Sequence, residues 1–129
     1  MNEKSDALFE RLMDFSVSII HLITNLPKQN EARVIGKQVV RCGTSVGAHY
    51  AEARRAKSNA DLVSKLEGGL QELEETGYWL AILKKAKIVA PTRLTELDSE
   101  VDQLIRIHVA SIKSVKARIE QSKRQTNMP

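Results

Sequence analysis

The sequence predicts an all-α protein that folds as an antiparallel, up-down-up-down four-helix bundle. Apolar residues recur at steps of three and four along four long segments, which is the spacing of one helix face. The apolar volume comes from Leu, Ile, Val and Ala, because aromatic residues make up only 4% of the chain. The prolines Pro27, Pro91 and Pro129 fall at breaks in this periodicity or at the end of the sequence. Short connections between long helices favour antiparallel neighbours, so we expect one domain over residues 1–129.

The first helix is predicted over residues 5–26, with Ser5 as its N-cap and Pro27 as its end. Its main apolar line alternates steps of four and three through Leu8, Leu12, Phe15, Ile19, Leu22 and Leu26. A second line beside it consists of Phe9, Met13, Val17, Ile20 and Ile23. An apolar surface of this width predicts that the first helix buries two faces.

The second helix is predicted over residues 30–57, with Asn30 as its N-cap. Its apolar line is Ile35, Val39, Cys42, Val46, Tyr50 and Ala53. Gly36, Gly43 and Gly47 lie beside that line at helical spacing. Because a glycine inside a helix costs about 1 kcal/mol relative to alanine, glycines on one side of a helix predict the close approach of another helix.

The third helix is predicted over residues 59–88 and the fourth over residues 92–121. Ser58, Asn59 or Asp61 can begin the third helix, and Pro91 and Thr92 mark a turn followed by a new N-cap. The tail at residues 122–129 has little apolar content and is predicted to fray.

The charge of the chain is arranged in blocks of alternating sign. The net charge is +4, and counting Lys and Arg against Asp and Glu gives +5 for residues 28–57 and +5 again for residues 106–124. An acidic segment precedes each of these blocks, and another follows the first. Such alternation suits complementary contacts between helices or subunits, and the basic blocks also suit contact with a polyanion.

The cysteine content and the hydropathy of the chain predict a cytoplasmic protein. A single cysteine, Cys42, excludes an internal disulfide framework and favours a reducing compartment. The N-terminal segment places acids among its apolar residues, unlike a signal peptide. No stretch approaches the ~18 apolar residues of a membrane span, so we expect no membrane partner.

The sequence predicts no catalytic residue, metal site or cofactor, and hence no enzyme. His21, His49 and His108 fall on different helices, but the chain lacks the Glu-x-x-His motif of di-iron bundles, so we expect surface or hydrogen-bonded histidines. Cys42 lies between apolar Val39 and Val46 and is expected to be a buried hydrophobe rather than a nucleophile. A metal-dependent or cysteine-based enzyme is the remaining, disfavoured alternative.

Two clusters are the candidate binding residues. The first is basic and comprises Arg33, Lys37, Arg41, Arg54, Arg55 and Lys57; the first three are spaced by four and form a stripe on one helix face. We weigh phosphate contact against a solvated face for this cluster. The second comprises Glu72, Glu75, Tyr78 and Trp79, and it predicts an oligomer interface or, equally, a cap on the intramolecular core.

These stretches resemble a known family, the four-helix-bundle proteins encoded by intervening sequences of bacterial large-subunit (23S) ribosomal RNA genes. The matching residues are Arg41, Ser45 and Val46, then Ala51, Glu52, Arg54 or Arg55, then Asp61, Leu62, Lys65 and Leu66, and finally Glu72, Glu75, Thr76, Tyr78, Trp79 and Leu80. The resemblance implies a homopentameric ring. It also implies kinship with the accessory variability determinant protein of diversity-generating retroelements, whose basic ring associates with reverse transcriptase and nucleic acid.

One departure from the family lies in the second helix. The family commonly has Asn-Ile-Ala-Glu-Gly there, whereas this chain has His49-Tyr50-Ala51-Glu52-Ala53. Alanine in place of that glycine favours a continuous helix.

Two functions from different classes follow as expectations. The first is a non-enzymatic, oligomeric protein that binds RNA or DNA through the basic cluster and assists assembly. The alternative is a protein–protein interaction scaffold that does not bind nucleic acid, in which the charge blocks serve subunit pairing and partner choice.

Overall fold

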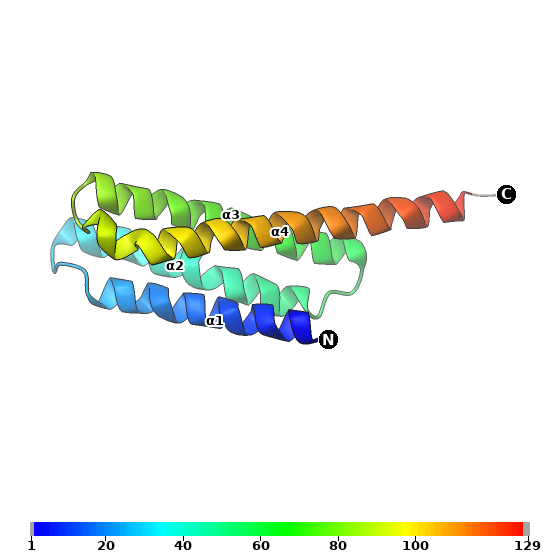
Figure 1. The fold of residues 1–129 in the computed structure, drawn as a ribbon, viewed down its shortest axis with the longest axis horizontal. Helices are drawn as coiled ribbons and strands as arrows, with labels where there is room; N and C mark the ends of the chain where they lie inside the picture. Colours follow the sequence, from blue (N-terminus) through cyan, green and yellow to red (C-terminus); the bar gives the residue numbers. More distant parts are fainter. Residues whose placement is uncertain (1, 128–129) are drawn as a thin grey trace.

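The computed structural model of the protein describes residues 2–127. These residues form α1 (Glu3–Thr24), α2 (Asn30–Ala53), α3 (Asn59–Lys85) and α4 (Pro91–Thr126). Consecutive helices run in opposite directions, and α4 extends well past the end of the others (Figure 1). The predicted all-α four-helix bundle is confirmed. Within the described residues, no helix combines the length and apolar content that would let it cross a membrane.

The N-terminal caps differ from the predicted ones at three of the four helices. Asn2 caps α1, because its side-chain oxygen accepts a hydrogen bond of 2.8 Å from the Ser5 backbone N–H. Ser58 caps α3 as the sequence allows, accepting from the Asp61 N–H at 3.0 Å. For α2 and α4 the predicted caps are wrong: the N-cap residue is Gln29 in α2 and Ala90 in α4, neither with a capping side-chain bond. Pro91 instead occupies the first turn of α4, where its missing N–H costs nothing.

The C-terminal boundaries differ from the predicted ones by a few residues. α1 ends at Thr24 rather than at residue 26. α2 ends at Ala53 rather than at residue 57, and the Arg55 and Ala56 N–H groups bond to carbonyls three residues back instead of four. α3 ends at Lys85 rather than at residue 88. Two residues after its end, Lys87 adopts the left-handed conformation that is typical of helix ends.

The predicted frayed tail is wrong for most of its length. α4 continues through residues 122–126 and ends at Thr126, with Asn127 as its C-cap. Lys123 and Arg124 lie in this last turn, where positive charge stabilises the negative end of the helix dipole. Residues 128 and 129 of the predicted tail lie outside the described residues.

The core runs through the middle of the bundle and is aliphatic. Its largest fully buried side chains include Leu12, Ile19, Leu73, Leu80, Leu83, Leu94 and Leu104, and the first two belong to the apolar line predicted for the first helix. The predicted close approach at the glycines of α2 is also present: a Cβ atom on Gly43 would lie 2.9 Å from Ile19 Cγ1. Glycine therefore lets α2 press directly on α1.

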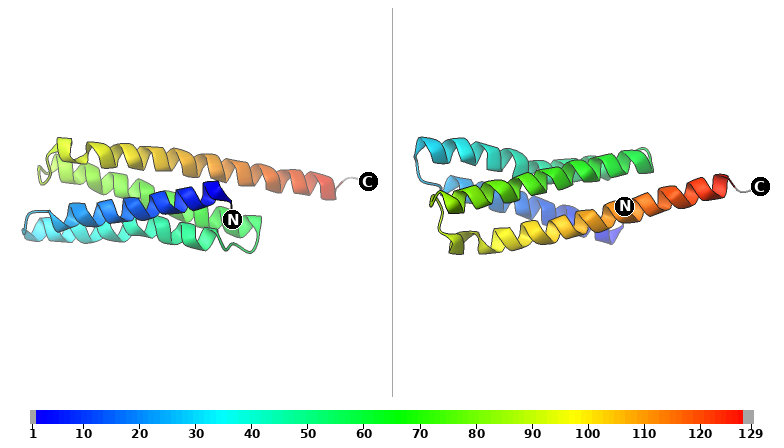
Figure 2. Two further views of the ribbon diagram at one scale, coloured as in Figure 1. Left: turned by 60° about the horizontal axis from the view of Figure 1, so that its bottom comes forward. Right: turned by 90° about the horizontal axis from the view of Figure 1, so that it is seen from above.

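The four helices do not pack equally on one another. α2 packs extensively on both α1 and α3, and α3 packs on α4, whereas α1 and α4 touch little. Arg11 on α1 bridges this seam with two hydrogen bonds to the Glu100 carboxylate on α4, at 2.8 and 2.6 Å. The right view of Figure 2 shows α1 running obliquely to α4 rather than parallel to it.

The second apolar face of α1 is exposed in the single chain, contrary to the prediction that it is buried. Met13, Val17 and Ile20 are 41%, 49% and 46% exposed. Because α1 is a peripheral helix that packs mainly on α2, no other helix of the described chain reaches this side. We call these three residues the α1 apolar stripe.

Candidate functional site

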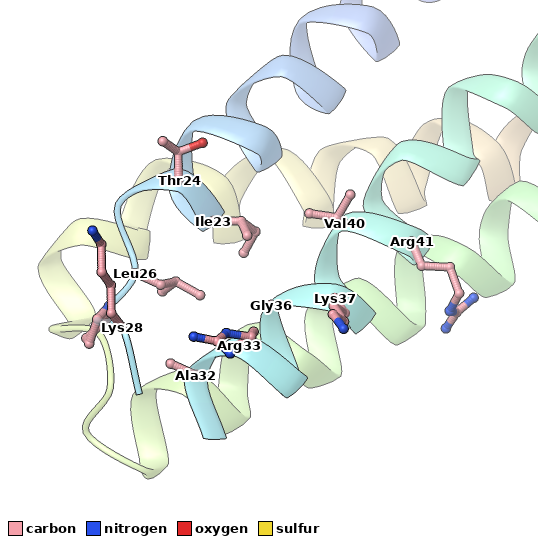
Figure 3. A pocket seen from close by; sticks show the side chains of 11 residues that line it. Ile23, Thr24, Leu26, Lys28, Ala32, Arg33, Gly36, Lys37, Val40 and Arg41 are labelled. Carbon is pink, nitrogen blue, oxygen red and sulfur yellow. The ribbon is translucent and has the colours of Figure 1, made fainter. Parts of the chain in front are cut away.

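A hollow of about 480 Å³ lies at the connection between α1 and α2. Four cationic side chains line it, and we call it the basic pocket; they are Lys28, Arg33, Lys37 and Arg41. Its floor is apolar and consists of Ile23, Leu26, Gly36 and Val40, with Ala32 beside them. Figure 3 shows Arg33, Lys37 and Arg41 following one another along α2.

The local sequence produces this arrangement through helical periodicity. Ala32, Gly36 and Val40 are spaced by four and face α1, while Arg33, Lys37 and Arg41 follow one position later and emerge beside them. A Cβ atom on Gly36 would lie 3.3 Å from both Ile23 and Leu26, so the two helices are in tight contact beneath the pocket.

Three of the four cations have no acidic partner among the described residues. Lys28, Arg33 and Lys37 are exposed, and the ion pairs found within residues 2–127 include none of them. The residues lining the pocket also include no Asp or Glu. The basic pocket therefore presents uncompensated positive charge, which attracts anions.

Arg41 behaves differently, because it pairs with α3. Its guanidinium contacts the Glu75 carboxylate, lies 3.5 Å from Glu72 and donates to Gln38 at 3.3 Å. The Trp79 indole N–H donates to the same Glu75 carboxylate at 3.1 Å. In Figure 3 the Arg41 guanidinium points away from the pocket. Arg41 thus belongs to the cluster predicted as an oligomer interface as much as to the basic one.

Within that second cluster, Tyr78 alone is mostly exposed. Its side chain is 57% exposed and meets the Trp79 ring edge to face, with ring centres 5.1 Å apart. Trp79 is half-buried against the core. Glu72 and Glu75 are occupied by Arg41. The cluster therefore ties α2 to α3 within one chain, and Tyr78 is the part of it that reaches solvent.

The other predicted cations lie at the opposite end of α2. At 1.5 Å per residue, Arg33 and Arg54 are about 30 Å apart along the helix axis. Arg54 pairs with Asp6 of α1 and lies 4.7 Å above the centre of the Phe9 ring. Arg55 and Lys57 are exposed in the connection between α2 and α3. The six predicted cations therefore do not form one site.

The groups considered for catalysis are engaged in packing or in helix hydrogen bonds. Cys42 is fully buried, and burial raises the pKa of its thiol, so the reactive thiolate is disfavoured. The Thr76 hydroxyl lies 3.2 Å from its sulfur. Ser45 donates its hydroxyl to the Arg41 carbonyl at 2.5 Å. Among the described residues, no group of His, Cys, Asp or Glu side chains is placed to hold a metal ion.

Two of the three histidines pack against a glycine pair in α3. A Cβ atom on Gly68 would lie 2.8 Å from the His49 ring, and one on Gly69 would lie 3.0 Å from His108 Nε2. His108 is buried, and its Nδ1 lies 2.9 Å from the Leu104 carbonyl oxygen, which it contacts as a donor. His49 Nδ1 is buried without a hydrogen-bond partner in the described chain. The glycines make room for these rings.

His108 is expected to make the stability of the protein depend on pH. Burial lowers the pKa of His108 from its usual 6.5, so below pH 6.5 the unfolded chain binds more protons than the folded one. Above about pH 6.5, His108 therefore does not reduce the free energy of unfolding. As the pH falls below that value, His108 lowers the free energy of unfolding by at most about 1.4 kcal/mol per pH unit. Urea unfolding between pH 7.5 and 5 measures it, and His108→Gln should show a shallower decline. If the free energy of unfolding changed equally with pH in both proteins, His108 would not be the cause of the decline.

Two features of the surface were not predicted from the sequence. One is the α1 apolar stripe, for which the second apolar line of the first helix was the available signal. The other is Lys28, which lies in the connection before α2, outside the periodicity by which the basic stripe was found.

Comparisons with known proteins agree with this fold. The family described as 23S rRNA-intervening sequence protein matches residues 5–110. A solved structure of a protein with unknown function, from the S23 ribosomal protein family of Bacteroides thetaiotaomicron VPI-5482, is 30% identical in sequence. The match covers 85% of this chain and 98% of that one, with a TM-score of 0.80. No curated protein matches the chain.

Proposed function

The chain belongs to the family of 23S rRNA-intervening sequence proteins, and from this premise we propose that it is a non-enzymatic, oligomeric protein of the cytoplasm that binds nucleic acid. The observation that carries the proposal is the basic pocket, where Lys28, Arg33 and Lys37 stand together without acidic partners in the described chain. Phosphate groups are the ligands that such a cluster suits.

The contacts would be made with the nucleic-acid backbone rather than with base edges. Lys28, Arg33 and Lys37 lie on an exposed surface at the end of the bundle, and the pocket floor offers aliphatic side chains but no aromatic ring for base stacking. Backbone contacts position a protein on nucleic acid without reading its sequence. We therefore propose binding without strong sequence preference, to RNA or DNA.

Oligomerisation would multiply this modest patch. Repeating one basic pocket around a symmetric ring raises the overall affinity without any new kind of contact, provided that several pockets reach the same strand. The ring that we propose is the homopentamer that the family resemblance implies. The α1 apolar stripe supports self-association, because an exposed row of large apolar side chains is unfavourable in a monomer.

A protein-interaction scaffold is the second candidate. The α1 apolar stripe and the exposed Tyr78 ring favour it, since both suit a protein surface better than a phosphate backbone. If the protein is a scaffold, we expect an oligomer in solution that shows no salt-sensitive binding to nucleic acid. Light scattering beside the titration described next separates the two candidates.

Replacing Arg33 and Lys37 by alanine is expected to weaken binding of RNA and DNA oligonucleotides. Each lost phosphate contact should reduce the magnitude of the slope of log K against log salt by about 0.7–0.9. For the double variant, we therefore expect the magnitude of this slope to fall by about 1.4–1.8 for each subunit that contacts the nucleic acid. Fluorescence anisotropy at several salt concentrations measures the slope. The matched control is Lys113→Ala with Arg124→Ala, which removes the same charge from the other basic block. An equal loss in the control, or no binding at low salt, would contradict the proposal.

A further inference from the structure

A second, larger hollow lies between α1 and α4, where the two helices diverge. Its volume is about 1240 Å³, and we call it the α1–α4 groove. The residues that define it are Lys4, Leu8, Lys57, Leu62, Ile107 and Arg118, which come from α1, α3, α4 and the α2–α3 connection. Small-molecule sites usually occupy about 300–1000 Å³. The groove is thus larger than a typical small-molecule site and suits a segment of polypeptide.

The groove is an open seam of the bundle. In a closed four-helix bundle the first and last helices pack along their whole length, but here α1 and α4 touch little, and α4 runs on beyond the start of α1 (Figures 1 and 2). Ala110, Ser111 and Ser114 line the α4 side, and Ala7 lines the α1 side. Side chains this small would let another helix approach closely between α1 and α4.

The lining combines an aliphatic floor with a rim of one charge sign. Leu66 and Val115 are buried at its base, and Leu8, Leu62 and Ile107 are half-buried above them. Every charged side chain that lines the groove is a cation, and no Asp or Glu is among the lining residues.

Some of that positive charge is compensated and some is not. Arg11 pairs with Glu100 and Arg54 pairs with Asp6, both outside the groove lining. For Lys4, Lys57 and Arg118 there is no ion pair with any residue in 2–127. A groove with three unpaired cations around an aliphatic floor fits a partner whose apolar face is flanked by carboxylates.

We infer that the α1–α4 groove binds an acidic amphipathic helix of a partner protein. The groove lining extends from Ile107 to Arg118 on α4, which corresponds to about 16 Å or three helical turns. A helix of that length presents apolar anchors at positions i, i+3 or i+4, and i+7 to such a groove. Lys4, Lys57 and Arg118 then face its acidic flanks.

The groove chemistry favours a helix over a nucleic-acid strand. Its one aromatic lining residue is Tyr50, whose ring is half-buried against the core and lies 6.3 Å from the Phe9 ring, centre to centre, so it is engaged within the bundle rather than offered for base stacking. The aliphatic floor contributes nothing to binding a phosphate backbone, whereas it would be covered by the apolar face of a helix. The groove is therefore a separate site from the basic pocket, with a different class of partner.

Synthetic peptides test the inference on the full chain. The probe is a fluorescein-labelled helix of about 15 residues, with leucines at i, i+4, i+7 and i+11 and glutamates beside them. One control peptide has the same composition in shuffled order, and another has lysine for each glutamate. Fluorescence anisotropy should show saturable, salt-sensitive binding of the acidic amphipathic peptide and weak or no binding of both controls.

Variants of the protein locate the binding. Lys57→Glu with Arg118→Glu should weaken peptide binding by at least about tenfold, and Ala110→Trp should weaken it by filling the groove without a change of charge. The matched control, Arg33→Glu with Lys37→Glu, reverses the same charge in the basic pocket and should leave peptide binding unchanged. Circular dichroism spectra must show that each variant keeps its helix content.

Several results would overturn the inference. They are the absence of saturable peptide binding, equal binding of the shuffled peptide, and an equal loss in the basic-pocket control. Loss of self-association in the Lys57→Glu, Arg118→Glu variant would identify a second copy as the occupant instead. Loss of RNA binding in that variant would identify nucleic acid. Because Arg33 and Lys37 lie outside the groove, failure of this inference leaves the proposed nucleic-acid binding standing, and the reverse also holds.

Discussion

Replacing both Val17 and Ile20 by aspartate is expected to dissociate the proposed oligomer into monomers. Both side chains are about half exposed in the single chain, so their contribution in an assembly comes from burial against another subunit. A carboxylate buried there without a partner costs about 3–5 kcal/mol, which corresponds to a loss of at least a hundredfold in association constant. Light scattering coupled to gel filtration measures the change in mass.

Matched substitutions decide which face forms the contact. Val34→Asp places a carboxylate on an exposed apolar residue of α2 that lies outside the α1 apolar stripe, and it should leave the proposed oligomer intact. Tyr78→Asp tests the interface predicted from the sequence. Dissociation by Tyr78→Asp and not by the α1 variants would show that the contact lies on α3, and a wild-type monomer would refute self-association altogether.

Replacing Gly43 by alanine is expected to destabilise the fold, whereas Gly77→Ala is expected to stabilise it. A Cβ atom on Gly43 would lie 2.9 and 3.0 Å from Cγ1 and Cγ2 of Ile19, a fully buried, branched side chain that cannot swing aside. Overpacking costs about 1–3 kcal/mol, which exceeds or offsets the gain of about 1 kcal/mol in helix propensity. At Gly77 the nearest atom is 3.6 Å away, so the propensity gain remains. Urea unfolding should separate the two variants by about 1–3 kcal/mol.

A double variant tests the cause of the Gly43 effect. Ile19→Val removes the Cδ1 methyl that a new Cβ would meet at 3.3 Å, and the smaller side chain has more freedom to shift. Gly43→Ala should therefore cost less in the Ile19→Val background than in the wild type, which appears as coupling between the two sites. If the two changes are additive, the clash with Ile19 is not the reason for the glycine.

The cation clusters show how far sequence periodicity can define a site. The spacing of Arg33, Lys37 and Arg41 correctly indicates a stripe on one helix face, because four-residue steps place side chains on the same side of any helix. It does not indicate that Arg41 turns to Glu72 and Glu75, which lie 31 and 34 residues away in the chain. That pairing exists because α3 packs alongside α2.

Arg54 shows the same limit at the other end of α2. Its partner Asp6 is 48 residues away, and the Phe9 ring beneath it belongs to the same helix as Asp6. Nothing in the local sequence distinguishes this paired arginine from its exposed neighbour Arg55. Only the packing of α1 on α2 separates the two.

The sequence by itself determined the all-α class, the approximate extents of the four helices and most of the core, since these depend on apolar periodicity and on local signals such as the Ser58 cap and Pro91. The tertiary structure alone decided which cations remain unpaired, which apolar face of α1 stays exposed and that a groove opens between α1 and α4. The physical reason is the distance along the chain over which each kind of interaction acts. A helix forms from interactions three and four residues apart, whereas pairing and exposure depend on which helices meet in space.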